Sequence, residues 1–111
     1  MAYDEELASR IRGLIGGEPG LTEQRMFGGL AFLVNGNMSV AASGQGGILL
    51  RVDPDESESL IESSSAAAFV MRGRPMRGWL RVDSEDLRDE AELAGWVELG
   101  VTFARSLPAK A

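Results

Sequence analysis

The sequence predicts an α+β protein with two layers, in which helices pack on one face of an antiparallel sheet. Helical periodicity occurs at both ends of the chain and once in its middle, and strand-like segments cluster in two groups between these helices. Short connections that contain glycine or asparagine join the strands, which is typical of antiparallel hairpins. The predicted order is therefore one helix, three or four strands, a short helix, two strands and a long helix.

The composition is that of an ordinary globular domain. The chain has 111 residues, of which 44% are hydrophobic and 25% are charged, so residues 1–111 are expected to form a single domain. Its net charge of −6 disfavours broad attraction to nucleic acid or to an anionic membrane. It contains no cysteine and no histidine, which excludes disulfides, Cys-ligated zinc and a histidine base. An acidic N-terminus, and no apolar run of about 20 residues, predict a cytoplasmic protein that does not enter a membrane.

The first helix is predicted over residues 3–16. Apolar residues recur there at i, i+4, i+7 and i+8, which places them on one stripe: Leu7, Ile11, Leu14 and Ile15. Acidic residues in the first turn interact favourably with the helix dipole. Gly16-Gly17 and Pro19-Gly20 end the helix, so residues 16–21 are expected to form a loop.

Residues 22–52 have strand-like patterns that glycine and asparagine interrupt. Four strands are predicted, over residues 22–28, 29–34, 38–43 and 48–52, and the loop 43–47 separates the last two. A second interpretation remains open at Gly28-Gly29, where a bend would join the first two segments into one kinked strand over 22–34.

The Asn35-Gly36-Asn37 segment allows two hairpin registers. A two-residue Asn35-Gly36 turn is a strong hairpin signal, but it mixes apolar and polar residues on both faces of the sheet by pairing Leu33 with Met38 and Phe32 with Ser39. A three-residue loop through Asn37 produces one wholly apolar face. Its pairs are Val34 with Met38, Phe32 with Val40, and Leu30 with Ala42.

We predict the three-residue loop, because burial selects the register that segregates apolar side chains. The second face of the sheet then carries Ala31, Leu33, Ser39 and Ala41. This face retains apolar surface, which predicts either a covering element or a partner.

A short second helix is predicted over residues 54–63. Asp53 is a suitable N-cap, Pro54 fits the first helical position, and Glu56 stands three residues after the cap. Leu60 and Ile61 are its apolar anchors. Two further strands follow, over residues 69–72 and 78–82, and the segment Gly73-Arg74-Pro75-Met76-Arg77 is expected to join them.

The last helix is predicted from Asp83-Ser84 to about Ser106. Apolar or small residues recur every three or four positions, which forms a stripe of Leu93, Trp96, Gly100, Phe103 and Leu107. This is the longest periodic segment of the chain.

The sequence contains no pattern that assembles a catalytic or cofactor site. A phosphate-binding Walker loop needs Gly-Lys-Ser/Thr, but the only lysine is Lys110. Gly44-Gln45-Gly46-Gly47 leads into a strand and is expected to be a hairpin loop. The carboxylates lie at helix starts or on polar helix faces, so none is marked for acid–base chemistry. We therefore expect no enzymatic activity, no cofactor and no metal site.

Arginines are concentrated in one segment. Arg72, Arg74, Arg77 and Arg81 are four of the eleven basic residues, and subtracting their four charges from −6 leaves −10 for the other residues. One interpretation is an anion site for a phosphate, a nucleic-acid backbone or an acidic partner, with Trp79 stacking on a base or a guanidinium. The other is a solvated hairpin whose charges protect a sheet edge. Arg77, Trp79 and Arg81 alternate, so they are expected to share one face.

Three segments resemble a known family in combination. They are Arg25-Met26-Phe27-Gly28-Gly29, Asn35-Gly36-Asn37-Met38 and Gly73-Arg74-Pro75-Met76-Arg77-Gly78-Trp79, in that order. Together they resemble the TfoX N-terminal domain family, over nearly the whole chain. The resemblance implies a fold similar to secretion-chaperone-like α+β domains. The best-known members are bacterial regulators of natural competence that add a C-terminal helical domain, and this chain resembles the stand-alone form.

The resemblance implies no catalytic residue, so its motif positions are candidates for fold or interface determinants. They are Arg25, Met26, Phe27, Gly28, Gly29, Arg74, Pro75, Met76, Arg77 and Trp79. From the residues themselves, Gly28 and Gly29 permit a bend, and Pro75 is expected to fix the turn between the last two strands. Phe27 and Trp79 are expected to pack.

The expected function is that of a non-enzymatic, bacterial, cytoplasmic regulatory or protein-interaction module with a protein partner. The family resemblance links it to transcriptional or competence regulation. A homodimer through the second sheet face or the long helix is predicted as its assembly. One alternative is nucleic-acid or anion binding through the hairpin Arg72–Arg81. Another is a small ligand-binding protein or enzyme with a pocket of Arg25, Arg74 and a carboxylate, although these arginines could instead pair with acidic groups such as Glu23.

Overall fold

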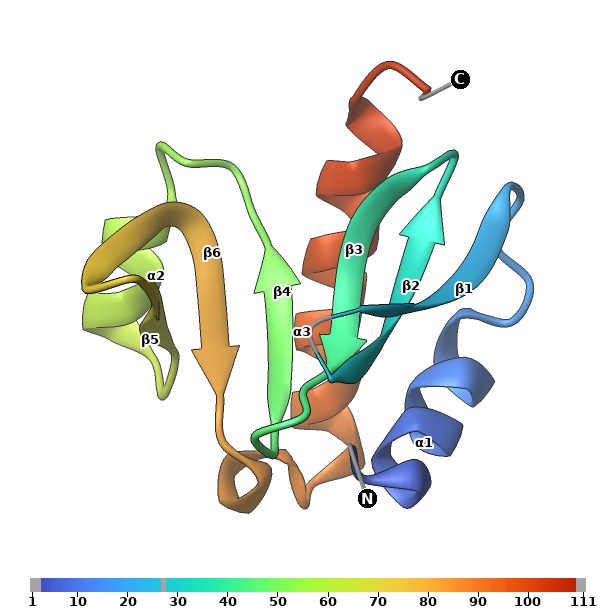
Figure 1. Cartoon of the computed structure of the whole chain (residues 1–111), viewed down its shortest axis with the longest axis horizontal. Coiled ribbons are helices and arrows are strands. Elements are labelled where there is room, and N and C mark those ends of the chain that lie inside the picture. Colours follow the sequence, from blue (N-terminus) through green and yellow to red (C-terminus); the bar gives the residue numbers. More distant parts are fainter. Residues whose placement is uncertain (1–2, 27, 110–111) are drawn as a thin grey trace.

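The structure is a computed structural model that describes residues 3–26 and 28–109, and these residues form one antiparallel sheet with helices (Figure 1). The strands lie in the order β1-β2-β3-β4-β6-β5. Their bounds are β1 Leu21–Met26, β2 Gly29–Val34, β3 Asn37–Ala42, β4 Ile48–Arg51, β5 Ala67–Met71 and β6 Arg74–Val82. The helices are α1 Glu5–Ile15, α2 Ser57–Ser63, the 3₁₀ helix η1 Ser84–Leu87, and α3 Glu90–Ser106. The predicted α+β class is confirmed.

Helices α1 and α3 pack together on one face of the sheet, and Figure 1 shows α3 behind β3 and β4. The strand residues that point toward these helices are fully buried: Phe32, Val34, Val40, Leu50, Leu80 and Val82. The shorter α2 lies against β5 and β6. One main core therefore lies between the sheet and the helices, as the apolar alternation of the strands predicts.

Helix α1 buries Leu7, Ile11 and Ile15, as predicted, and Asp4 caps it by accepting hydrogen bonds from the backbone N–H groups of Glu6 and Leu7. The prediction that Leu14 belongs to the buried stripe is wrong, because this side chain is 37% exposed. It lines a groove of about 400 Å³ between α1 and α3.

The chain reverses fully between β1 and β2, so the interpretation of one kinked strand over 22–34 is wrong. Met26 pairs with Gly29, so the chain turns between them. Gly28 in that turn has a φ of +74°, which glycine adopts without strain. At Gly29 a Cβ atom would lie 2.2 Å from the carbonyl oxygen of Ala42, so only glycine allows this approach of β2 to β3.

The β2–β3 hairpin combines the two registers that the sequence allows. Asn35 and Gly36 both have positive φ values, 53° and 83°, and form a two-residue turn, so the predicted three-residue loop is wrong. Leu33 pairs with Met38 next to this turn. A β-bulge then shifts the register, so that Phe32 pairs with Val40 and Leu30 with Ala42, as predicted for the apolar face.

Ser39 is the residue that the bulge adds, and its position explains how both registers coexist. It is fully buried, and its hydroxyl donates a 2.7 Å hydrogen bond to the carbonyl oxygen of Phe32. Helix α3 lies very close to β3 at this point. A Cβ atom added to Gly100 would lie only 2.5 Å from the Ser39 carbonyl oxygen. One extra residue therefore satisfies both the preferred turn and the burial of the apolar face.

Helix α2 begins at Ser57, three residues later than predicted. Asp53 caps a turn instead of the helix, since its Oδ1 accepts a 2.9 Å hydrogen bond from the backbone N–H of Asp55. The carbonyl oxygen of Pro54 then accepts the hydroxyl of Ser57 at 3.0 Å. The prediction that Asp53 caps the helix is therefore wrong, because its side chain closes a separate turn before α2.

The β5–β6 connection is shorter than predicted. Arg72 and Gly73, with φ values of 54° and 78°, form a two-residue turn, and β6 begins at Arg74. Pro75 does not fix this turn, because it lies within β6 opposite Val70. A proline is tolerated there because β4 pairs only with the later part of β6, residues 79–82, which leaves Pro75 without a second neighbouring strand.

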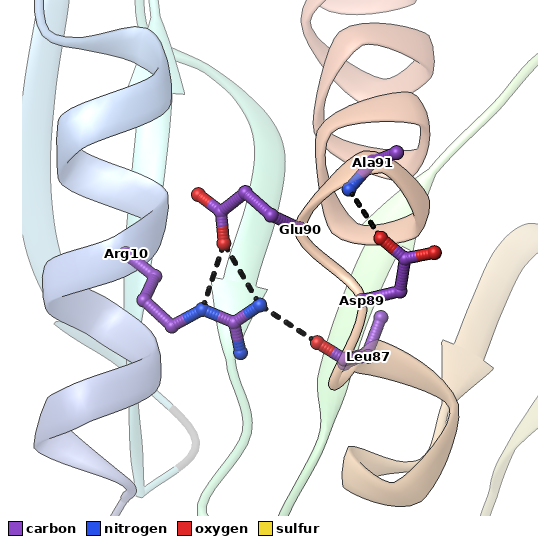
Figure 2. Close-up of polar contacts among 5 residues, drawn as sticks. All are labelled: Arg10, Leu87, Asp89, Glu90 and Ala91. Carbon is purple, nitrogen blue, oxygen red and sulfur yellow. Dashed lines mark hydrogen bonds and ion pairs between the residues drawn. The ribbon is translucent and has the colours of Figure 1, made fainter.

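The predicted last helix is divided into η1 and α3, as Figure 2 shows. In an unbroken helix the carbonyl oxygen of Leu87 would accept from the N–H of Ala91. Here that N–H donates to Asp89 Oδ1 at 3.0 Å, and the Leu87 carbonyl oxygen accepts from Arg10 Nη2 at 2.8 Å. Arg10 also binds Glu90 Oε1 at 2.9 Å, so a side chain from α1 stabilises the break.

The rest of the predicted stripe on α3 is confirmed. Leu93, Trp96 and Gly100 are buried, while Phe103 and Leu107 are half-buried. In the part of the chain that the structure describes, no helix is long and apolar enough to cross a membrane.

Candidate interaction surface

The first motif segment lies at the hairpin between β1 and β2. Met26 ends β1 and is half-buried, Gly28 and Gly29 form and follow the turn, and Arg25 is exposed on β1. Phe27 lies outside the described residues, so its predicted packing is not described. Most of this segment therefore contributes to the backbone geometry of the hairpin.

Arg25 does not pair with Glu23. The partner of Glu23 is Arg12 of α1, with Nε–Oε2 at 2.7 Å and Nη2–Oε1 at 2.8 Å. These hydrogen bonds, opposed by some desolvation, hold the pKa of Glu23 below its usual value. Similarly, hydrogen bonds from Arg105 lower the pKa of Glu18, which lies in the loop between α1 and β1.

The sheet has a second apolar cluster on the face away from α1 and α3, which we call the helix-free face. Ala31, Met38, Ala41 and Leu49 are buried there, and half-buried side chains pack against them: Met26, Leu33, Phe69 and Trp79. The prediction of an apolar second face is confirmed, with Met38 in place of Ser39. Side chains from both ends of the sheet cover much of this face and leave a pocket of about 90 Å³.

The candidate residues of the segment 73–79, which we call the second motif segment, are more exposed than those of the first. Arg74, Pro75, Met76 and Arg77 are all exposed, and Trp79 is half-buried on the helix-free face. A pocket of about 200 Å³ lies between α2 and this segment; we call it the hairpin pocket. Its apolar lining is Ile61, Ala68, Pro75, Met76 and Trp79.

The four clustered arginines do not form one continuous site. Arg77 pairs with Asp55 at 2.9 Å, whereas Arg81 donates to Ser43 Oγ at 3.2 Å and to the carbonyl oxygen of Gly46 at 3.0 Å. The predicted alternation along β6 is interrupted between these two arginines, because Gly78 has a φ of +88°. Arg77 and Arg81 therefore bind residues of two different loops.

Arg72 and Arg74 differ from the other two. Both are exposed at the turn between β5 and β6, and neither has an ion pair or side-chain hydrogen bond with any residue within 3–26 or 28–109. They are the arginines of this segment that remain available to a partner.

The structure does not bring Arg25 and Arg74 together. Arg25 lies on β1 and Arg74 on β6, which are separated by three strands in the sheet. Among the described residues, no group of three or more acidic side chains is arranged to hold a metal ion.

Two residues of this surface were missed in the sequence. Val70, on edge strand β5, is 56% exposed, and Arg51 places its guanidinium 5.4 Å from the centre of the Trp79 ring. Both lie in apolar strands that the sequence presents as ordinary core segments. Only the strand order shows that β5 is an edge and that β4 lies beside β6.

The family assignment agrees with this architecture. A sequence model of the TfoX N-terminal domain matches residues 14–104, which run from the end of α1 through the whole sheet and into the last turns of α3. The chain has no significant match among curated proteins and none among solved structures. Because the match covers most of the 111 residues, this chain belongs to the TfoX N-terminal domain family.

Proposed function

We propose that this chain is a non-enzymatic, cytoplasmic regulatory module that acts by binding a protein partner. The observation that carries the proposal is the exposure of the second motif segment. Arg74, Met76 and Arg77 are exposed, and Met76 and Arg77 line the hairpin pocket, although later residues of the same strand are buried. Family motif residues that contribute little to packing are expected to serve recognition.

The chemistry of this surface supports a protein as the partner. Protein interfaces combine an apolar anchor with a polar rim, and methionine and arginine are enriched in them. The hairpin pocket has an apolar lining, with arginine at its edge. Membership of the TfoX N-terminal domain family supports a role related to the regulation of competence.

The homodimer stays a prediction, and the structure of the second sheet face offers it little support. It was based on apolar surface left on the second sheet face, and the central side chains of that face are buried by Met26, Leu33, Phe69 and Trp79. Our proposal therefore places the partner at the second motif segment.

The test is affinity capture from native cells, with identification of the captured proteins by mass spectrometry. Wild type is compared with an Arg74→Ala, Arg77→Ala variant and with Arg88→Ala, a control at an exposed arginine between η1 and α3. We expect one protein to be captured by wild type and by the control, and to be depleted with the double variant.

Two results would contradict the proposal. Capture of nucleic acid without a specific protein would favour the alternative of nucleic-acid binding. Equal capture by all three forms would remove the second motif segment as the recognition element.

A further inference from the structure

We propose that the hairpin pocket is a docking site for an acidic segment of another protein that inserts one apolar side chain. This inference rests on the proposed function and adds the place of binding and the chemistry of the partner.

The pocket is suited to a single apolar anchor. Its volume is about 200 Å³, and Ile61 of α2 lines it together with Met76 and Trp79 of β6. An apolar cavity of about 150 Å³ can hold benzene, so one aromatic or branched side chain fits. Methionine in the wall adapts to different occupants because its side chain is unbranched and flexible.

Exposed apolar surface continues beyond the pocket. Val70 is 56% exposed and Met76 is 36% exposed, and they are two of the three exposed large hydrophobic residues among those the structure describes. Val70 pairs with Pro75, which lines the pocket, so exposed apolar surface extends from the pocket onto edge strand β5. Clustered exposed apolar side chains of this kind mark sites of protein contact.

The hairpin tip beside the pocket is positively charged, whereas the pocket lining itself contains one carboxylate, Glu58, and one arginine, Arg77. Arg72 and Arg74 stand at the hairpin tip without an ion pair to any described residue, while Arg77 forms an exposed pair with Asp55, whose side chain is 84% exposed. The chain as a whole has a net charge of −6. Carboxylates on a partner would therefore find complementary charge here and repulsion over much of the remaining surface.

A symmetric contact with a second copy fits less well. In a two-fold dimer the same patch lies on both sides of the interface, so Arg72 and Arg74 of both copies would be brought into one contact. Such like-charge contacts are unfavourable.

Nucleic acid also fits less well than an acidic peptide. The lining of the pocket includes Ile61, Met76 and Trp79, and a phosphate backbone carries no apolar side chain that could fill it. The combination of Val70, Met76 and unpaired arginines is matched better by a segment with both apolar and acidic side chains.

The experiment uses a displayed library of random short peptides, selected on the immobilised 111-residue chain. The strongest peptide is then synthesised, and its affinity is measured by fluorescence anisotropy at low and physiological salt. Wild type is compared with Arg72→Glu, Arg74→Glu; with Met76→Glu; and with the control Arg88→Glu. Amide chemical shifts locate the bound peptide, and a single-stranded DNA oligonucleotide serves as the competing probe.

We expect selected peptides to combine Asp or Glu with one large apolar residue. The double arginine variant and Met76→Glu should each weaken binding about tenfold or more, and the control should change it by less than about twofold. Shift changes should centre on residues 68–77 and on Ile61. Because the substituted residues are exposed, the variants should keep the wild-type unfolding curve.

The inference is overturned if no peptide is selected, if the selected peptides lack acidic residues, or if shift changes lie elsewhere. Tighter binding of the oligonucleotide would identify a nucleic-acid surface, and a concentration-dependent doubling of mass through this patch would identify a second copy. If peptide docking fails but native capture still yields a specific protein, the proposed function stands and only this site and partner chemistry are rejected.

Discussion

Hairpins β1–β2 and β5–β6 lie at opposite ends of the same sheet, and each carries a family motif with glycine near its turn, but their surroundings differ. In the first, Gly29 lies against the backbone of β3, and Glu23 is held by Arg12. In the second, Gly73 has open space around it, and Val70 is 56% exposed. The first motif thus determines backbone packing, whereas the second leaves its side chains available for contact.

The neighbouring β2–β3 turn extends this contrast. The backbone N–H of Asn35 donates to the carbonyl oxygen of Gly20 at 3.0 Å, and the buried Asn37 donates through Nδ2 to the carbonyl oxygen of Pro108 at 2.9 Å. Hydrogen bonds at this hairpin therefore connect it both to the loop after α1 and to the segment after α3. The turn at Arg72 and Gly73 makes no comparable side-chain hydrogen bond within the described residues.

The largest expected effect on the free energy of unfolding is at Gly29, which we compare with Gly73 of the other hairpin. Gly29→Ala should lower the free energy of unfolding by about 3 kcal/mol or more, because its Cβ would lie 2.2 Å from a backbone oxygen of β3. Gly73→Ala meets no atom and should cost only about 1–2 kcal/mol, the penalty of a left-handed φ. Urea denaturation measures both, and equal losses would show that the two turns are equivalent.

A smaller effect is expected where α3 touches the first region. Gly100→Ala should destabilise the protein by about 2 kcal/mol, since the new Cβ would lie 2.5 Å from the Ser39 carbonyl oxygen. Gly95→Ala, on the same helix but with open space, should stabilise it by up to about 1 kcal/mol through helix propensity. Thermal unfolding of the matched pair checks the opposite signs, and destabilisation by both would contradict the close approach at Ser39.

The smallest expected effect is on the pH dependence of the free energy of unfolding. The pKa of Glu23 is lowered in the folded state by hydrogen bonds from Arg12, so the unfolded state binds more protons near that pKa. The contribution of this pair is fully present above the ordinary pKa of 4.5 and is lost as pH falls through the lower folded value. Glu23→Gln should therefore reduce stability at neutral pH and flatten its decline on acidification, measured by urea denaturation across pH.

At neutral pH, Asp55→Asn in the second region should reduce stability less than Glu23→Gln, because the Asp55 side chain is 84% exposed. A larger loss for Asp55→Asn would show that the second region also depends on its ion pair.

Several elements could be predicted because the residues that determine them are close in sequence. The stripe of Leu7, Ile11 and Ile15 predicts α1, and Asn35-Gly36-Asn37 predicts a hairpin, although the predicted three-residue loop is wrong. Errors arose where a local signal had two possible uses. Asp53 has the chemistry of an N-cap, but it closes a separate turn before α2, and Pro75 has the chemistry of a turn residue, but it lies in a strand.

The candidate surface was predicted in part for the same reason. The sequence identifies Arg74, Met76 and Arg77 as a basic segment with apolar residues, because they are adjacent. It does not indicate that Asp55 pairs with Arg77, or that Ile61 lines a pocket together with Met76. Those contacts depend on how α2 packs against β6.

By itself, the sequence determined the α+β class, most of the helical stripes and the family motifs, since these follow from periodicity and from the preferences of nearby residues. Only the tertiary structure decided the bulge at Ser39, the helix break that Arg10 stabilises, and the exposure of Val70 and Met76. Each of these depends on residues distant in sequence. The close packing of α3 on β3, the approach of α1 to the start of α3, and the edge position of β5 bring those residues together or leave them uncovered.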